Sequence, residues 1–71
     1  MTDKDRENAI KYNLKYAVKQ RYFTGKVEAW IETCNPNCRD SFEEYDSYDF
    51  YFTVFDNEQD AKKFQQECLV A

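Results

Sequence analysis

Residues 40–49 are the part of the chain whose side chains could do the most chemistry. They include five acids, three aromatic residues and no base, and because the whole chain carries −4, the other 61 residues sum to +1. Such a segment stays in solvent and favours a basic partner surface. Aromatic rings among the carboxylates can anchor what the charges attract, so we predict a partner-binding segment. Its predicted contact residues are Asp40, Phe42, Glu43, Glu44, Tyr45, Asp46, Tyr48 and Asp49. The alternative is a solvated loop that only keeps a small protein soluble.

The sequence contains few residues that are suited to catalysis or to metal binding. The chain has no His, which is the commonest general base, and Ser41 and Ser47 have no suitable base near them in the sequence. Cys34 and Cys38 flank a turn, but a structural zinc site uses four Cys or His ligands and Cys68 is the only further thiol. Cys34 and Cys38 are therefore weak metal candidates, and we interpret them as reduced thiols. We expect no enzymatic activity, no metal and no cofactor.

The size of the chain predicts one small domain over residues 1–71. A domain of this size buries only about 60% of its unfolded surface. The chain nevertheless contains 13 aromatic residues, so some of them should form a surface patch. The first residues are charged where a secretory signal would be apolar, and the three Cys are an odd number. We therefore expect a cytoplasmic protein without a membrane segment, in which residues 1–8 fray.

A β-hairpin is predicted in the first half of the chain. Apolar residues alternate with polar ones from Ile10 to Val18, which is a strand pattern, and Thr24 with Gly25 can form a two-residue turn. The predicted register pairs Tyr22 with Val27, Gln20 with Ala29, Val18 with Ile31, Tyr16 with Thr33, Arg21 with Glu28, and Lys19 with Trp30. Glu32 then lies diagonal to Lys19, and a cation–π contact with Trp30 is expected. The competing interpretation is a helix over residues 3–22, capped by Thr2.

The second half of the chain predicts a loop, a strand and a helix. A turn at residues 35–37 opens an acidic loop over residues 35–48, and residues 48–55 are rich in aromatic and β-branched types, as strands are. Asp56 or Asn57 can cap a final helix. The apolar stripe of that helix contains Ala61, Phe64, Cys68 and Leu69. The predicted fold is α+β: a three-stranded antiparallel sheet with one C-terminal helix on one face (β-β-β-α), with α-β-β-α as the alternative.

One helix can cover only one face of such a sheet. The more aliphatic side should face the helix: Leu14, Val18, Val27, Ala29 and Ile31, with Phe50, Phe52 and Val54. The other side carries Trp30, joined by Tyr51 and Phe55 if the third strand is in phase. We predict that Trp30, Tyr51 and Phe55 extend the partner-binding site, because an uncovered aromatic face is an interaction surface or a dimer interface. The alternative is that the N-terminal segment or the acidic loop covers this face.

Residues 50–63 run from an aromatic strand into a capped helix with a conspicuous Ala61. In this they resemble the third strand and second helix of RNA-recognition-motif domains, whose strand aromatics stack bases. The resemblance implies single-stranded nucleic-acid binding. The basic residue and Gly that precede the first aromatic in that family are Tyr48 and Asp49 here, and Tyr51 replaces its small residue. We therefore interpret residues 50–63 as the general chemistry of a strand that turns into a capped helix.

These features predict a small, acidic, non-enzymatic protein-binding module. Its partner would be a basic protein surface, such as that of a nucleic-acid-handling protein. Phage and mobile-element inhibitors of host enzymes include small acidic proteins of this style. Two alternatives remain open: a homodimer with no specific role for the acidic segment, and a protein that binds single-stranded nucleic acid through its aromatic face.

Overall fold

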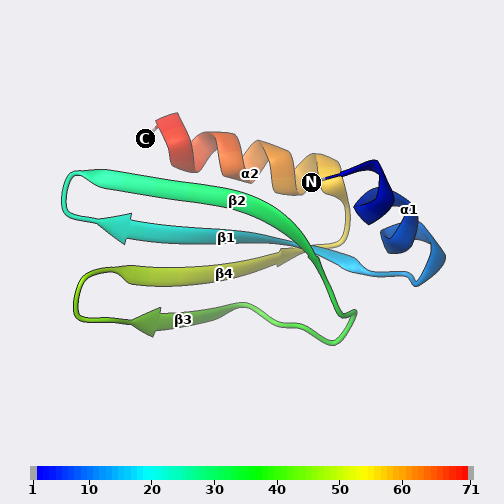
Figure 1. Cartoon of the computed structure of the whole chain (residues 1–71), viewed down its shortest axis with the longest axis horizontal. Coiled ribbons are helices and arrows are strands. Elements are labelled where there is room, and N and C mark those ends of the chain that lie inside the picture. The colour runs from blue at the N-terminus through cyan, green and yellow to red at the C-terminus, as the bar shows by residue number, and fades with distance from the viewer. Residues whose placement is uncertain (1, 71) are drawn as a thin grey trace.

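The chain forms a four-stranded antiparallel sheet with a helix near each end of the sequence. The computed structural model describes residues 2–70. The elements in chain order are α1 (Asp3–Lys11), β1 (Lys15–Phe23), β2 (Lys26–Cys34), β3 (Ser41–Glu44), β4 (Asp49–Phe55) and α2 (Glu58–Val70). The strand order across the sheet is β2-β1-β4-β3 (Figure 1). The predicted α+β class, with an antiparallel sheet and a C-terminal helix, is confirmed; the structure adds a fourth strand and a second helix.

The β1–β2 hairpin has the predicted register. Tyr22 lies opposite Val27 and Val18 lies opposite Ile31, as expected from a turn at Thr24 and Gly25. Gly25 has φ +76°, a conformation that glycine adopts without steric cost. The turn residues and the alternation of apolar and polar residues along both strands therefore predict this hairpin and its register correctly.

The N-terminal segment is a helix and not the beginning of β1. The Thr2 hydroxyl accepts a hydrogen bond from the Asp5 amide, and the Asp5 carboxylate accepts one from the Thr2 amide, which together form a capping box. The helix ends because Asn13 adopts φ +53°. The amides of Asn13 and Leu14 then bond the carbonyls of Ile10 and Ala9, in the pattern of a Schellman motif.

This helix corrects both sequence interpretations of the N-terminal third. Ile10, predicted to be a strand residue, lies in α1 and is 82% exposed. The alternative helix over residues 3–22 is also wrong beyond Lys11, because residues 15–23 are strand β1. Residues 3–8 of the segment expected to fray are helical, and residue 1 lies outside the described residues.

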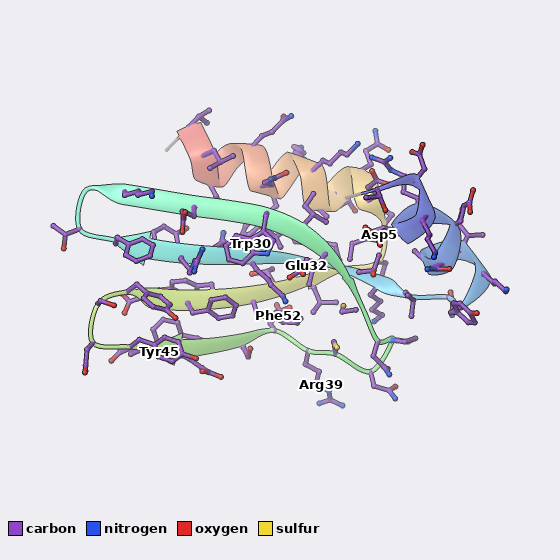
Figure 2. All side chains as sticks on the ribbon, viewed as in Figure 1. Asp5, Trp30, Glu32, Arg39, Tyr45 and Phe52 are labelled. Atoms are coloured by element: carbon purple, nitrogen blue, oxygen red, sulfur yellow. The ribbon has the colours of Figure 1, made fainter. Side chains whose placement is uncertain are left out.

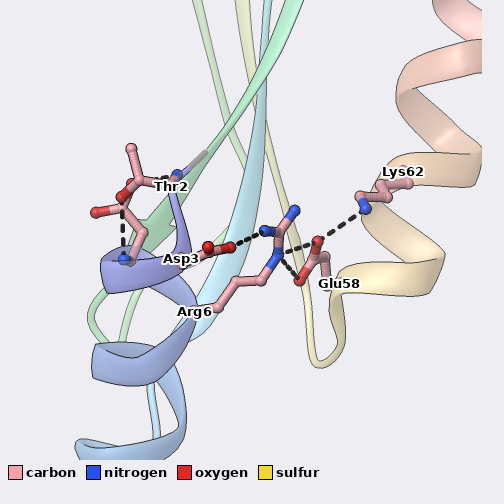
Figure 3. A network of polar contacts seen from close by, with 6 residues as sticks. Thr2, Asp3, Arg6, Glu58 and Lys62 are labelled. Atoms are coloured by element: carbon pink, nitrogen blue, oxygen red, sulfur yellow. Dashed lines mark hydrogen bonds and ion pairs between the residues drawn. The ribbon is translucent and has the colours of Figure 1, made fainter.

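An ion-pair network ties α1 to the start of α2 (Figure 3). Arg6 Nε donates to both carboxylate oxygens of Glu58, at 2.8 and 3.0 Å. Asp3 pairs with the same guanidinium at 3.1 Å, and Lys62 pairs with Glu58 at 3.0 Å. The hydrogen bond from Arg6 lowers the pKa of Glu58. The network holds α1 at one end of the sheet, beside the first turn of α2, so α1 does not lie across the sheet (Figure 1).

Helix α2 covers one face of the sheet, mainly over β2 and β1. Asn57 caps α2 by accepting from the Asp60 amide at 2.8 Å. Ala61 is fully buried and Phe64 packs on Phe55, with ring centroids 5.2 Å apart. Leu69, predicted to lie on the buried stripe, is instead 51% exposed, because the side of α2 that faces the sheet runs through Ala61, Gln65 and Cys68.

Strand β4 has the opposite phase to the one that sequence reasoning assumed. Tyr51 pairs with Gln20 and Phe55 with Tyr16, residues of the helix-covered face. Phe50, Phe52 and Val54, predicted to be core, therefore lie on the uncovered face with Trp30. They were misplaced because residues 50–55 are aromatic or β-branched on both faces, so no polar alternation reveals the phase.

The segment predicted to be an acidic loop contains a strand. Ser41–Glu44 forms β3, which pairs with β4 and occupies one edge of the sheet. The strand is short and presents Glu43 and Glu44, features that protect an edge from pairing with another chain. Among residues 2–70, neither helix has the length and apolar character needed to cross a membrane.

Candidate functional site

The sheet face opposite α2, which we call the open face, balances its own charges. Arg21 Nη2 pairs with Glu28 Oε1 at 2.9 Å, and Lys19 pairs with Glu32. Trp30 Nε1 donates to Glu32 Oε2 at 3.1 Å. The hydrogen bond from Lys19 is the main cause of a lowered Glu32 pKa, and that from Trp30 acts in the same direction.

Aromatic rings on the open face lie against these cations. The guanidinium carbon of Arg21 is 4.9 Å from the Trp30 ring centroid, and Lys19 Nζ is 5.9 Å from that of Phe52. The expected cation–π contact of Trp30 is therefore made by Arg21 and not by Lys19. Figure 2 shows Trp30, Glu32 and Phe52 over the middle of the sheet. Trp30, Phe50 and Phe52 are each half-buried.

Strands β3 and β4 with their turn, residues 41–55, form the acidic hairpin. The Tyr45 amide donates to the Tyr48 carbonyl at 2.9 Å and closes the turn. Glu44 and Asp49 lie directly opposite each other on the two strands, and hence on the same face. Like charges in that arrangement are destabilising. Within residues 2–70, neither Glu44, Asp46 nor Asp49 forms an ion pair.

The aromatic residues of the hairpin divide between its two sides. On the open-face side, Tyr45 stacks on Tyr48 at 4.8 Å between centroids, and the Tyr45 hydroxyl donates to Glu43, which raises the pKa of Tyr45. On the helix side, Phe42 packs on Tyr51 at 4.6 Å. Phe42 and Tyr45 are each 47% exposed and Tyr51 is 37% exposed, so both sides present rings to solvent.

A groove of about 590 Å³ lies on the helix side, between α2 and strands β1 and β4. Tyr22 and Tyr51 meet edge to face in it, with centroids 5.3 Å apart. Gln20 is only 3% exposed and donates a hydrogen bond to the Cys68 thiol. The residues that line the groove are Gln20, Tyr22, Asp49, Tyr51, Thr53, Phe64, Glu67 and Cys68.

The structure brings together most of the predicted contact residues, with three exceptions. Asp40 is exposed, but its carboxylate already accepts a hydrogen bond from the Val54 amide at 2.7 Å. Phe55 is packed against Phe64 on the helix side. Trp30 lies on the open face, on the other side of the sheet from Tyr51, so the predicted patch of Trp30, Tyr51 and Phe55 does not exist as one surface.

The two thiols at the turn after β2 are close neighbours. Burial, followed by the neighbouring Cys38, raises the pKa of Cys34 to about 11. All three Cys are free. No group of three or more His, Cys, Asp or Glu side chains among the described residues is arranged to hold a metal ion.

Sequence reasoning missed Gln20, Tyr22 and Glu67 as surroundings of the acidic segment. The predicted register of the β1–β2 hairpin places Tyr22 and Gln20 correctly. Which residues of β4 lie beside them depends, however, on how β4 pairs with β1. Glu67 lies one residue before Cys68 on α2, so the predicted contact of Cys68 with the sheet could have brought it to notice.

Comparison with known proteins gives no relative for the chain: no family model matches it, and no curated protein or solved structure is significantly similar.

Proposed function

We propose that the chain is a small non-enzymatic module that binds a basic protein surface through the acidic hairpin. The observation that carries the proposal is the cross-strand pair of Glu44 and Asp49, which has no cation among the described residues. Folding gains nothing from such a pair, because like charges opposite each other destabilise a hairpin. A basic partner would turn this internal cost into attraction and faster association.

The exposed rings support the same role. Phe42, Tyr45 and Tyr51 present apolar area beside the carboxylates, and solvent-exposed aromatics of this kind commonly anchor interfaces. A surface of a nucleic-acid-handling protein is a natural partner, since it already carries Lys and Arg for phosphates. Inhibition of such a protein, in the manner of phage and mobile-element inhibitors, is the biological role that we infer.

The test is charge reversal of the hairpin. We expect Glu43→Lys, Glu44→Lys and Asp46→Lys together to abolish recovery of the partners that the wild-type chain retains from a host extract, identified by mass spectrometry. Glu7→Lys is the control for a charge reversal outside the hairpin, because Glu7 is exposed on α1, at the other end of the sheet from the hairpin turn. Recovery of the same proteins by wild type and triple variant would contradict the proposal.

Nucleic-acid binding on the open face is the second candidate, and one observation favours it. Trp30, Phe50 and Phe52 lie there beside Lys19 and Arg21, the combination of rings and cations that single strands use. Trp30 is the only Trp, so its fluorescence reports on this face alone. Quenching by a single-stranded oligonucleotide at low salt would support this candidate, and unchanged emission would dismiss it.

Light scattering distinguishes a homodimer from the two candidates above. A monomer at micromolar concentration leaves the hairpin and the open face accessible to other molecules. A dimer that dissociates on Trp30→Ala would instead place the contact on the open face.

A further inference from the structure

The groove between α2 and β4 is continuous with the acidic hairpin. Asp49 and Tyr51 belong to both, and Phe42 extends the groove's aromatic wall by packing on Tyr51. The groove volume of about 590 Å³ is within the usual range for a ligand site, about 300–1,000 Å³. A partner seated on the helix side of the hairpin would therefore reach the groove with its side chains.

The charge of the groove selects a cation. Among the residues that the structure describes, its lining contains two carboxylates, Asp49 and Glu67, and no Lys or Arg. Neither carboxylate forms an ion pair or accepts a hydrogen bond from another side chain of residues 2–70. By contrast, the carboxylates of Glu28 and Glu32 on the open face are both paired with cations.

A buried amide adds a hydrogen-bond acceptor that the fold does not use. Gln20 lines the groove and is 97% buried, since only 3% of it is exposed. Its nitrogen donates to Cys68, and within residues 2–70 its oxygen accepts no hydrogen bond from another side chain. This oxygen is not among the buried side-chain atoms that lack a partner in residues 2–70, so it reaches the open groove and is available to a donor that enters there.

The rings in the groove favour a planar cation. Tyr22 and Tyr51 meet edge to face, and Phe64 contributes from α2. A guanidinium can stack on such faces while its several N–H groups reach carboxylates and an amide oxygen together. A Lys ammonium is a compact, strongly hydrated charge and cannot do both.

We propose that this groove binds an arginine side chain from a basic segment of the partner. The inference rests on the proposed function in that it gives the chemistry of the partner at the helix side of the hairpin. The guanidinium would lie against Tyr51 and Tyr22, with Asp49, Glu67 and the Gln20 oxygen as acceptors.

The experiment is a titration of the full chain, labelled with ¹⁵N, with the peptide acetyl-Ala-Arg-Ala-Arg-Ala-amide, and with its Lys counterpart as a second probe. We expect the largest shift changes at Tyr22, Tyr51, Glu67 and Cys68. The arginine peptide should bind about threefold tighter than the lysine peptide or better. Equal affinity for both peptides, or shift changes confined to residues 43–48, would contradict the proposal that the groove binds an arginine side chain.

Isosteric variants separate this inference from the proposed function. Asp49→Asn with Glu67→Gln should weaken binding of the arginine peptide at least about tenfold, since it removes two charge-assisted acceptors. Glu7→Gln is the control for a loss of charge outside the groove and should bind like wild type. Wild-type affinity in the double variant, with loss in the Lys variant of residues 43, 44 and 46, would reject the groove and keep the hairpin. Weakened binding in the double variant, with wild-type affinity in the Lys variant, would reject the hairpin tip as the contact and keep the groove. Should the double variant lose the dispersed spectrum of a folded chain, the shift map of the wild-type protein decides alone.

Discussion

The open face and the acidic hairpin are built from the same kinds of residue, aromatic rings and charges, but they balance their charges differently. On the open face, Arg21 and Lys19 each have a carboxylate and a ring as neighbours within the chain. On the hairpin, Glu44 and Asp49 oppose each other, and neither pairs with a cation of residues 2–70. Charges that are paired contribute to folding, whereas charges left unpaired repel each other and remain free to attract another molecule. This difference directs us to the hairpin as the contact surface.

The largest effect should follow from removing Arg21. Arg21→Ala deletes the pair with Glu28 and the cation–π contact with Trp30. We expect the free energy of unfolding to fall by about 1–2 kcal/mol. The Nε–H of Arg21 is buried without an acceptor among the described residues, which keeps the loss at the lower end. Urea denaturation followed by Trp30 fluorescence measures it.

Arg21→Lys is the control for that experiment. The ammonium keeps the charge but not the planar group, so we expect about half of the loss. A stability of Arg21→Ala equal to that of wild type would show that the open face does not depend on its internal pairs.

The next effect has the opposite sign. Glu44→Lys places a cation opposite Asp49, so repulsion across the hairpin becomes attraction. We expect the free energy of unfolding to rise by about 0.5–1 kcal/mol, the size of a cross-strand charge pair. The gain should diminish in high salt, because the pair is exposed and screened.

The same substitution should weaken binding to a basic partner, so stability and binding would change in opposite directions. A matched Ser41→Lys variant adds a cation on the open-face side of β3, opposite Phe52, and should not give the same gain. A loss of stability in Glu44→Lys would mean that Glu44 already has a stabilising role.

The sequence predicted the β1–β2 hairpin down to its register but not the surroundings of the acidic segment. The hairpin is local: a turn at Gly25 and two strands of period two decide it. The end of α1 was hidden because Ile10 and Leu14 continue the alternation of β1, although Asn13 stops the helix between them. No local pattern could give the phase of β4, because its two faces are equally apolar.

The candidate site, like the fold, could be predicted from the sequence only where it depends on neighbouring residues. The acidic segment itself is visible in composition, since five acids within ten residues need no structure to be noticed. The groove depends on three elements far apart in the sequence, β1, β4 and α2. Its formation required the pairing of Gln20 with Tyr51, which sequence reasoning had placed on opposite faces.

A smaller effect is the pH dependence of stability that a paired carboxylate contributes. The hydrogen bond from Lys19 lowers the pKa of Glu32 below its ordinary value of 4.5. A lowered pKa in the folded state stabilises the fold above that ordinary value, and the contribution is lost as the pH falls through the folded pKa. We expect Glu32→Gln to cost about 0.5 kcal/mol near pH 7 and to remove this part of the acid dependence. Urea denaturation at pH 7 and at successively lower pH measures both.

Asp46→Asn is the comparison on the hairpin side, because Asp46 is exposed and pairs with no cation among the described residues. Its stability should match that of wild type near pH 7. An equal loss in the two variants would remove the distinction between the two regions.

The smallest effect is a change in one titration. The hydrogen bond from the Tyr45 hydroxyl to Glu43 raises the pKa of Tyr45, because a phenolate could not donate it and would meet the carboxylate charge. A raised pKa in the folded state favours folding at neutral pH, and this preference is lost as the pH rises through the folded pKa. Glu43→Gln should therefore return the Tyr45 pKa toward its ordinary value, measured from the ¹³C shift of the assigned tyrosine ring. High salt should shift the wild-type titration in the same direction by screening the carboxylate, and a titration that responds to neither change would mean that the hairpin acids do not act on their neighbours.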